Sequence, residues 1–107
     1  MKNSKKFTDE CIKLYGKNSQ IMIAIEEMSE LQKELCKYIR RTENPGEYTD
    51  AQIAETIQHI QEETADVYVT VGKIAYIFGE AEIEKIQEQK IARCKKKMSE
   101  WKARQSK

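Results

Sequence analysis

The sequence predicts an all-α protein, a bundle of four helices, and three observations lead to this prediction. The chain has one Pro and four Gly among 107 residues, which argues against a loop-rich or all-β fold. Apolar residues recur at steps of three and four along several segments, which is the period of a helix. Hydrophobic residues make up 39% of the chain and charged residues 35%, a composition that suits a slim bundle sharing a core with a second copy. We expect a single domain over residues 1–107, with its core over about 19–102.

The first helix is expected from about Lys5 to Tyr15, because apolar residues give this segment one apolar side. Gly16 follows it and is expected to end the helix in the left-handed conformation. Asn18 or Ser19 is the residue that we expect to cap the next helix.

The second helix is expected from about Gln20 to Arg41. Its apolar residues recur at steps of four and three and form one helical stripe: Ile21, Ile25, Met28, Leu31, Leu35 and Ile39. Glu27 falls on the margin of that stripe, and Glu30 and Glu34 fall farther around the helix at about 100° per residue.

A loop is expected over Thr42–Tyr48, because it contains a Pro-Gly pair, which is typical of turns. Thr49 and Gln52 then have the spacing of a capping box, so we place the third helix from about Asp50 to Phe78. Its main stripe is Ile53, Ile57, Ile60, Val67, Val71, Ile74 and Phe78. Apolar side chains surround most of the second half of this helix, which indicates a central helix or a subunit interface. We therefore expect a homodimer or a homotetramer.

The fourth helix is expected from about Glu80 to Lys102, after Gly79 ends the third. One face carries Ile83, Ile86, Cys94, Met98 and Trp101. Lys90 and Lys97 project into the same arc, with Arg93 at its rim. A lysine on an apolar face needs an anionic partner or must extend outward to water.

Two acidic turns, Glu26–Glu30 and Glu62–Asp66, are the feature around which we interpret function. Each places two carboxylates three residues apart, and residues three apart are neighbours on a helix surface. Facing turns would aim Glu27, Glu30, Glu63 and Asp66 at one small volume. Like charges cannot share that volume without a counter-charge, and hard divalent cations take oxygen ligands. The sequence therefore predicts a magnesium site between two helices.

These motifs resemble those of the MazG-like nucleotide pyrophosphohydrolases, members of the all-α NTP pyrophosphatase superfamily. The resemblance runs from about residue 19 to residue 98. It rests on EExxE at Glu26–Glu30, on ExxD at Glu63–Asp66, and on a KxxR-type motif at Lys90–Arg93. The chain departs from the family in two respects: the gap between the acidic motifs is longer than in compact members, and Glu88 stands where well-studied members commonly have Asn.

The resemblance implies a Mg²⁺-dependent enzyme, with Mn²⁺ as a substitute, that converts a nucleoside or deoxynucleoside triphosphate and water to the monophosphate and pyrophosphate. Such an activity would serve nucleotide-pool house-cleaning or regulation. It implies metal ligation by Glu27, Glu30, Glu63 and Asp66. For orienting or deprotonating water, Glu26 or Glu62 is the candidate. The candidate phosphate contacts are Lys90, Arg93, Lys97 and Lys73.

Charge and composition limit the other possibilities. The net charge of +1 provides no overall field for nucleic acid or a membrane, so we expect neither as a partner. Three cysteines, an odd number without paired spacing, indicate reduced thiols, and no apolar run reaches the length of a membrane span; we expect a cytoplasmic protein. His59 is either a contact at the edge of the site or a partly buried polar side chain. The alternative to an enzyme is a helical interaction or regulatory module whose acidic turns are solvated.

Overall fold

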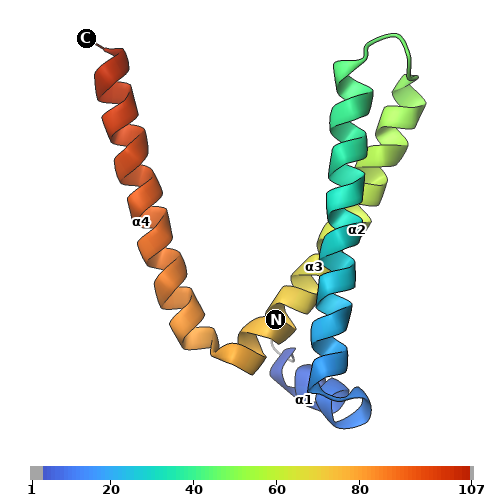
Figure 1. Ribbon diagram of the computed structural model, residues 1–107, viewed down its shortest axis with the longest axis vertical. Helices are drawn as coiled ribbons and strands as arrows, with labels where there is room; N and C mark the ends of the chain where they lie inside the picture. The colour runs from blue at the N-terminus through green and yellow to red at the C-terminus, as the bar shows by residue number, and fades with distance from the viewer. Residues whose placement is uncertain (1–3, 107) are drawn as a thin grey trace. The chain divides into compact units, whose positions relative to one another are not determined.

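The computed structural model describes residues 4–106, and every regular element within them is a helix. The order is α1 (Ser4–Tyr15), α2 (Lys17–Glu43), α3 (Asp50–Phe78) and α4 (Glu80–Gln105), as labelled in Figure 1. The predicted all-α class and the predicted number of helices are confirmed for this part of the chain. The chain divides into two compact units, one extending to Ile77 and the other starting at Phe78.

The start of α3 follows the prediction in atomic detail. The Thr49 backbone N–H donates to Gln52 Oε1 at 2.8 Å, and the Gln52 backbone N–H donates to Thr49 Oγ1 at 3.1 Å. This reciprocal pair is a capping box, which satisfies backbone donors that the first helical turn leaves free. It explains why α3 begins at Asp50, where the sequence placed it.

The start of α2 differs from the prediction, because neither Asn18 nor Ser19 caps it. The helix begins at Lys17 with Gly16 as its cap residue, and no side chain makes a capping hydrogen bond. Gly16 has φ of 89°, a conformation that glycine adopts without a Cβ clash. The chain therefore turns sharply at Gly16 itself, and the helical conformation resumes at the next residue.

Helices α2 and α3 form an antiparallel hairpin, seen side by side in Figure 1. At one end, Lys73 Nζ donates to Gln20 Oε1 at 2.9 Å; at the other, Arg41 Nη1 donates to Thr56 Oγ1 at 2.7 Å. The first pair joins residues far apart in the sequence and the second pair joins residues close to the loop, which is the pattern of antiparallel neighbours.

Helix α1 is held against the end of this hairpin. Tyr76 Oη donates to Asp9 Oδ1 at 2.7 Å, and Lys73 Nζ lies 4.9 Å from the centre of the Phe7 ring, within the range of a cation–π contact. Thr8 and Cys11 of α1 are buried.

The face of α2 that packs on α3 is not the apolar stripe that the sequence suggested. Leu31 of that stripe is half-buried, but Ile25, Met28, Leu35 and Ile39 are 40–54% exposed. The contact face is shifted by about one residue, and much of it is polar. Among the described residues, the buried hydrophobic side chains are Cys11 and Ala24, and the buried polar ones are Thr8, Gln20, Thr56 and Thr70.

Helix α4 is continuous to Gln105, three residues beyond the predicted end at Lys102. Its side chains are exposed along the whole helix, including the predicted apolar face with Met98 and Trp101 at 57% and 56%. Within the part of the chain that the structure describes, none of the four helices has the length and apolar character needed to cross a membrane.

Candidate metal centre

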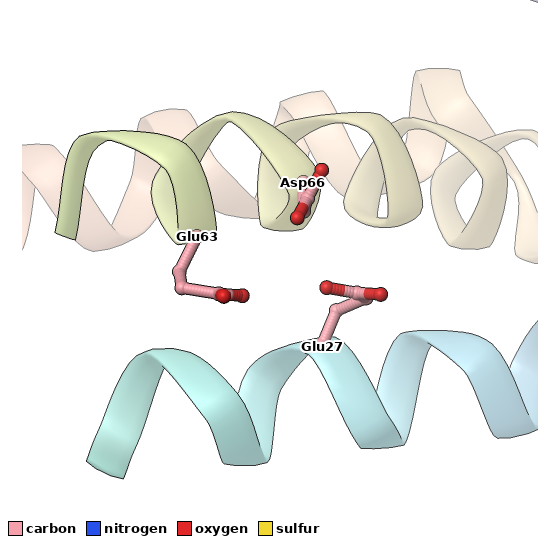
Figure 2. A group of neighbouring side chains, drawn as sticks. All are labelled: Glu27, Glu63 and Asp66. Atoms are coloured by element: carbon pink, nitrogen blue, oxygen red, sulfur yellow. The ribbon is translucent and has the colours of Figure 1, made fainter. Parts of the chain in front are cut away.

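Three of the predicted ligands meet between the two helices of the hairpin. Glu27 projects from α2 toward Glu63 and Asp66 on α3, as Figure 2 shows. One carboxylate oxygen of each residue lies within 4.8 Å of the others. Glu27 and Glu63 are half-buried and Asp66 is exposed, so the group lies at the edge of the helix contact and opens to solvent on one side.

A seven-residue repeat places these side chains. Glu27 follows the buried Gln20 by seven residues, and Glu63 follows the buried Thr56 by seven. Seven residues are nearly two helical turns, so residues at this spacing return to the same face of a helix. Both carboxylates therefore lie in the contact between α2 and α3, and Asp66 stands one turn farther along α3.

Burial and mutual repulsion both act on this group. Loss of hydration raises the pKa of Glu27, and the negative charges of Asp66 and Glu63 raise it further. The pKa of Glu63 is raised by its burial first, and then by the charges of Asp66 and Glu30. Both effects disfavour the ionised carboxylates, so a cation between them would remove a cost that the protein alone does not offset.

Glu30, the fourth predicted ligand, is not a member of the converging group. It is exposed, although its charge reaches Glu27 and Glu63 and raises the pKa of each. Glu30 follows Glu27 by three residues, as Asp66 follows Glu63, so both stand at the rim of the contact. Of the two, Asp66 is the one with a carboxylate oxygen within 4.8 Å of the others. Glu26 and Glu62, the candidates for handling water, are also exposed.

The spacing of the three oxygens suits a small divalent cation. Two oxygens on opposite sides of Mg²⁺ lie about 4.2 Å apart, twice a bond of about 2.1 Å. The observed upper limit of 4.8 Å exceeds this by an amount that small side-chain rotations can close. Mg²⁺ is commonly bound through one or two carboxylates and keeps several waters, so two of the three carboxylates would suffice as direct ligands, and the third would accept hydrogen bonds from the bound water. The donor set therefore fits the predicted ion.

One acidic residue beside this group was not predicted from the sequence. Glu34 was placed away from the apolar stripe, yet its side chain is only 13% exposed. Lys37 Nζ donates to Glu34 Oε1 at 3.2 Å, and His59 Nδ1 lies 3.8 Å from Oε2. Within residues 4–106, that Oε2 is the buried side-chain atom without a hydrogen-bond partner. The available signal was its position seven residues after Glu27.

The predicted phosphate contacts lie in both units. Lys73, on α3, already donates to Gln20 and lies over Phe7. Lys90 and Arg93 are neighbours on α4, where they line a shallow hollow with Ile86 and Gln89. Lys97 lies on the same helix beside Met98 and Trp101, among the residues that line a second hollow.

Comparisons with protein-family models, with curated proteins and with solved structures found no match for this chain.

Proposed function

We propose that this protein is a Mg²⁺-dependent pyrophosphohydrolase that cleaves a nucleoside or deoxynucleoside triphosphate to the monophosphate and pyrophosphate. The observation that carries the proposal is the convergence of Glu27, Glu63 and Asp66 from two helices. These are residues of the two acidic motifs on which the resemblance to the MazG-like enzymes rests.

The charge of the substrate explains why a metal ion is needed at this site. A triphosphate is a polyanion, and three clustered carboxylates would repel it unless a cation lay between them. Bound Mg²⁺ would offset phosphate charge and lower the pKa of a water molecule so that it becomes a usable nucleophile. In this proposal Glu27, Glu63 and Asp66 hold the ion, and Glu30 joins them from the rim when substrate is bound.

The remaining roles fall to groups at or outside the rim of the cluster. Glu26 or Glu62 would accept a proton from the attacking water, a task that suits a carboxylate open to solvent. On α4, Lys90 and Arg93 would bind phosphate oxygens through charge-assisted hydrogen bonds, with Lys97 one turn beyond Arg93. Lys73 would have to exchange its hydrogen bond with Gln20 for one with phosphate.

A pyrophosphate-release assay over a panel of canonical and modified nucleotides, with Mg²⁺, with Mn²⁺ and with neither ion, tests the proposal. We expect equimolar monophosphate and pyrophosphate from at least one nucleotide, only when an ion is present. Release of single phosphate groups would point to a different hydrolase. Inertness across the panel would favour the alternative, a helical interaction module.

A further inference from the structure

The contact positions of the hairpin recur every seven residues in each helix. The buried or half-buried side chains at this spacing include Gln20, Glu27 and Glu34 in α2, and Thr56, Glu63 and Thr70 in α3. Because the two helices run in opposite directions, residues that follow such a position by three lie on one side of the hairpin in both helices. Residues that follow by one or by five lie on the other side.

One of these sides is charged. The positions that follow by three carry five ionisable side chains: Glu30, Lys37, His59, Asp66 and Lys73. The positions that follow by one or by five hold no Asp, Glu, Lys or Arg, and they form the uncharged side. The candidate metal centre opens on the charged side, through the exposed Asp66. His59 lies on this same side, seven residues before Asp66.

Glu34 is an acidic residue of the helix contact that has no role in the proposed mechanism. Its side chain is 13% exposed. Lys37 Nζ donates to its Oε1 at 3.2 Å, whereas Oε2 is buried without a hydrogen-bond partner. A buried carboxylate oxygen without a donor is costly. His59 Nδ1 lies 3.8 Å from Oε2 and is a group that can supply the donor.

We propose that Glu34 and His59 form a carboxylate–imidazole pair in which His59 takes a proton from the attacking water and Glu34 is the positioning residue. The assignment rests on the proposed function, because the water is that of the proposed hydrolysis. The separation of 3.8 Å is longer than a hydrogen bond of about 2.6–3.2 Å, and acid–base pairs often have such looser spacing before substrate binds.

The imidazole ring has two nitrogens, and the contact with Glu34 determines which of them can accept a proton. A proton on Nδ1 is directed at the carboxylate, so Nε2 of the neutral ring keeps a lone pair and is an acceptor. The side chain of His59 is 42% exposed, which leaves Nε2 accessible to water on the charged side.

Helical geometry turns His59 closer to the contact than the two exposed candidates for this proton. His59 precedes Glu63 by four residues, which is about 6 Å along α3 and a net rotation of about 40°. Glu62 precedes Glu63 by one residue, a rotation of about 100°, and Glu26 has the same relation to Glu27; both are exposed. A water molecule about 2.1 Å from an ion at Glu63 and a hydrogen bond of about 2.9 Å from that water to Nε2 can cover the distance.

The proposed step is balanced in atoms and electrons. The water oxygen forms a bond to a phosphorus atom next to the α–β bridging oxygen of the triphosphate. The bond between that phosphorus and the bridging oxygen breaks, and its electron pair stays on the bridging oxygen. One proton of the water passes to Nε2 of His59, and the carboxylate of Glu34 stabilises the imidazolium that forms. His59 then returns this proton to solvent.

Two substitutions separate proton transfer from a purely structural pair. In Glu34→Gln, the ammonium of Lys37 retains the amide oxygen at the place of Oε1, so the amide nitrogen faces Nδ1 and donates to it. The ring proton then lies on Nε2, which can no longer accept one. His59→Asn keeps a donor near the place of Nδ1 but removes Nε2, so a structural contact with Glu34 survives in it. The matched control is Gln58→Asn, at the exposed position next to His59.

The position of the ring proton can be measured directly. His59 is the one histidine of the chain, so its two nitrogens give a single pair of ¹⁵N NMR signals, which distinguish a neutral ring protonated at Nδ1 from one protonated at Nε2. We expect the Nδ1–H form in the wild type and in the control, and the Nε2–H form in Glu34→Gln. A wild-type ring protonated at Nε2 would overturn the inference, and this measurement requires neither activity nor a metal ion.

Steady-state kinetics of pyrophosphate release provide the second readout. We expect kcat to fall by at least about 100-fold in Glu34→Gln and in His59→Asn, with KM within about twofold of wild type and helicity unchanged. The Gln58→Asn control should keep wild-type kcat. An active wild type whose His59→Asn variant keeps its kcat would overturn the inference and leave the proposed function intact, whereas an inert wild type would overturn the proposed function and with it the role of His59. If His59→Asn loses helicity, Glu34→Gln decides, because it retains the ring and changes its tautomer.

Discussion

The two sides of the α2–α3 hairpin are built from the same two helices, yet one side is charged and the other is not. The charged side carries Glu30 and Asp66 next to a contact that already contains two carboxylates, whereas the uncharged side carries Met28 and Leu35 at equivalent depth. The two sets differ by two positions in a seven-residue repeat. In a narrow hairpin the position of a residue in this repeat therefore decides whether its side chain lies on the charged or on the uncharged side.

The sharpest way to test the charged side is to remove one ligand charge. Glu63→Gln keeps the size of the side chain but replaces an anionic oxygen with a neutral amide, a much weaker ligand for Mg²⁺. We expect Mg²⁺-dependent pyrophosphate release to fall by at least about 100-fold, with the helical circular dichroism signal unchanged.

The control for this substitution is Glu55→Gln, because Glu55 lies two turns earlier on α3 and is exposed. It should keep wild-type activity. Full activity in the Glu63 variant would show that the charged side does not hold the catalytic ion.

The contact between α2 and α3 can be weakened without changing a residue on either exposed side. Thr56 is fully buried; its Oγ1 accepts a hydrogen bond from Arg41 and donates one to the Gln52 carbonyl at 3.0 Å. Thr56→Val removes both bonds and leaves the guanidinium with one fewer acceptor. We expect the free energy of unfolding to fall by about 2 kcal/mol, measured by urea denaturation.

Thr42→Val provides the comparison for this loss. Thr42 is exposed and its hydroxyl donates to the Tyr38 carbonyl of its own helix, so the change should cost less than about 0.5 kcal/mol. Equal losses in the two variants would mean that the Arg41–Thr56 pair does not fasten the hairpin.

Substitution of Lys73 distinguishes a structural role of this residue from a role in substrate binding. Lys73→Met keeps the aliphatic chain but removes the hydrogen bond to Gln20 and the charge over Phe7. We expect a loss of about 1 kcal/mol in the free energy of unfolding. If Lys73 also binds phosphate, KM for the nucleotide rises as well, and an unchanged KM would limit this residue to holding α1 and α2 in place. Lys33→Met, at an exposed position of α2, should alter neither quantity.

The smallest expected effect is a pH dependence of stability. The folded protein holds protons on Glu27 and Glu63 more tightly than the unfolded chain, because the pKa of each is raised above its ordinary value of 4.5. Without divalent ions, the stability that these two groups contribute is therefore greatest at or below that pH. It decreases as pH rises through the raised pKa values.

Mg²⁺ should reverse this trend, since it competes with protons for the same oxygens and binds more tightly as they ionise. The measurement is Tm between about pH 4.5 and pH 7, with and without Mg²⁺. Glu27→Gln should flatten both curves; an unaltered pH profile in this variant would remove Glu27 from the titrating group.

Much of the local structure could be predicted from the sequence, because it depends on neighbours along the chain. The capping box at Thr49 and Gln52 and the glycine at position 79 fix the two ends of α3 at the predicted residues. The start of α2 was predicted incorrectly because two residues with good capping side chains, Asn18 and Ser19, follow a glycine whose own turn begins the helix.

The packing between helices was harder to predict. Helix α2 has two faces offset by one residue, one with Leu35 and Ile39 and one with Glu27 and Glu34, and hydrophobicity favoured the first. The structure places the polar face inward, where Arg41 donates to Thr56 and Lys73 donates to Gln20 across the contact. Pairing preferences between distant helices are absent from the periodicity of either helix alone. For the same reason Glu34 was missed while Glu27, Glu63 and Asp66 were found.

The seven-residue repeat of the contact has a consequence for how this chain can change in length. One residue inserted into α3 between Thr56 and Glu63 would rotate everything beyond it by about 100°, carrying Glu63 and Asp66 away from Glu27. The connection between α2 and α3 bears no such constraint, since added residues there leave both helical phases intact. Length variation that preserves the carboxylate cluster is thus confined to the connection or to whole heptads. In a series of insertion variants, we expect Mg²⁺ to raise Tm when residues are added to the connection or when seven are added to α3, and not when one residue is added to α3.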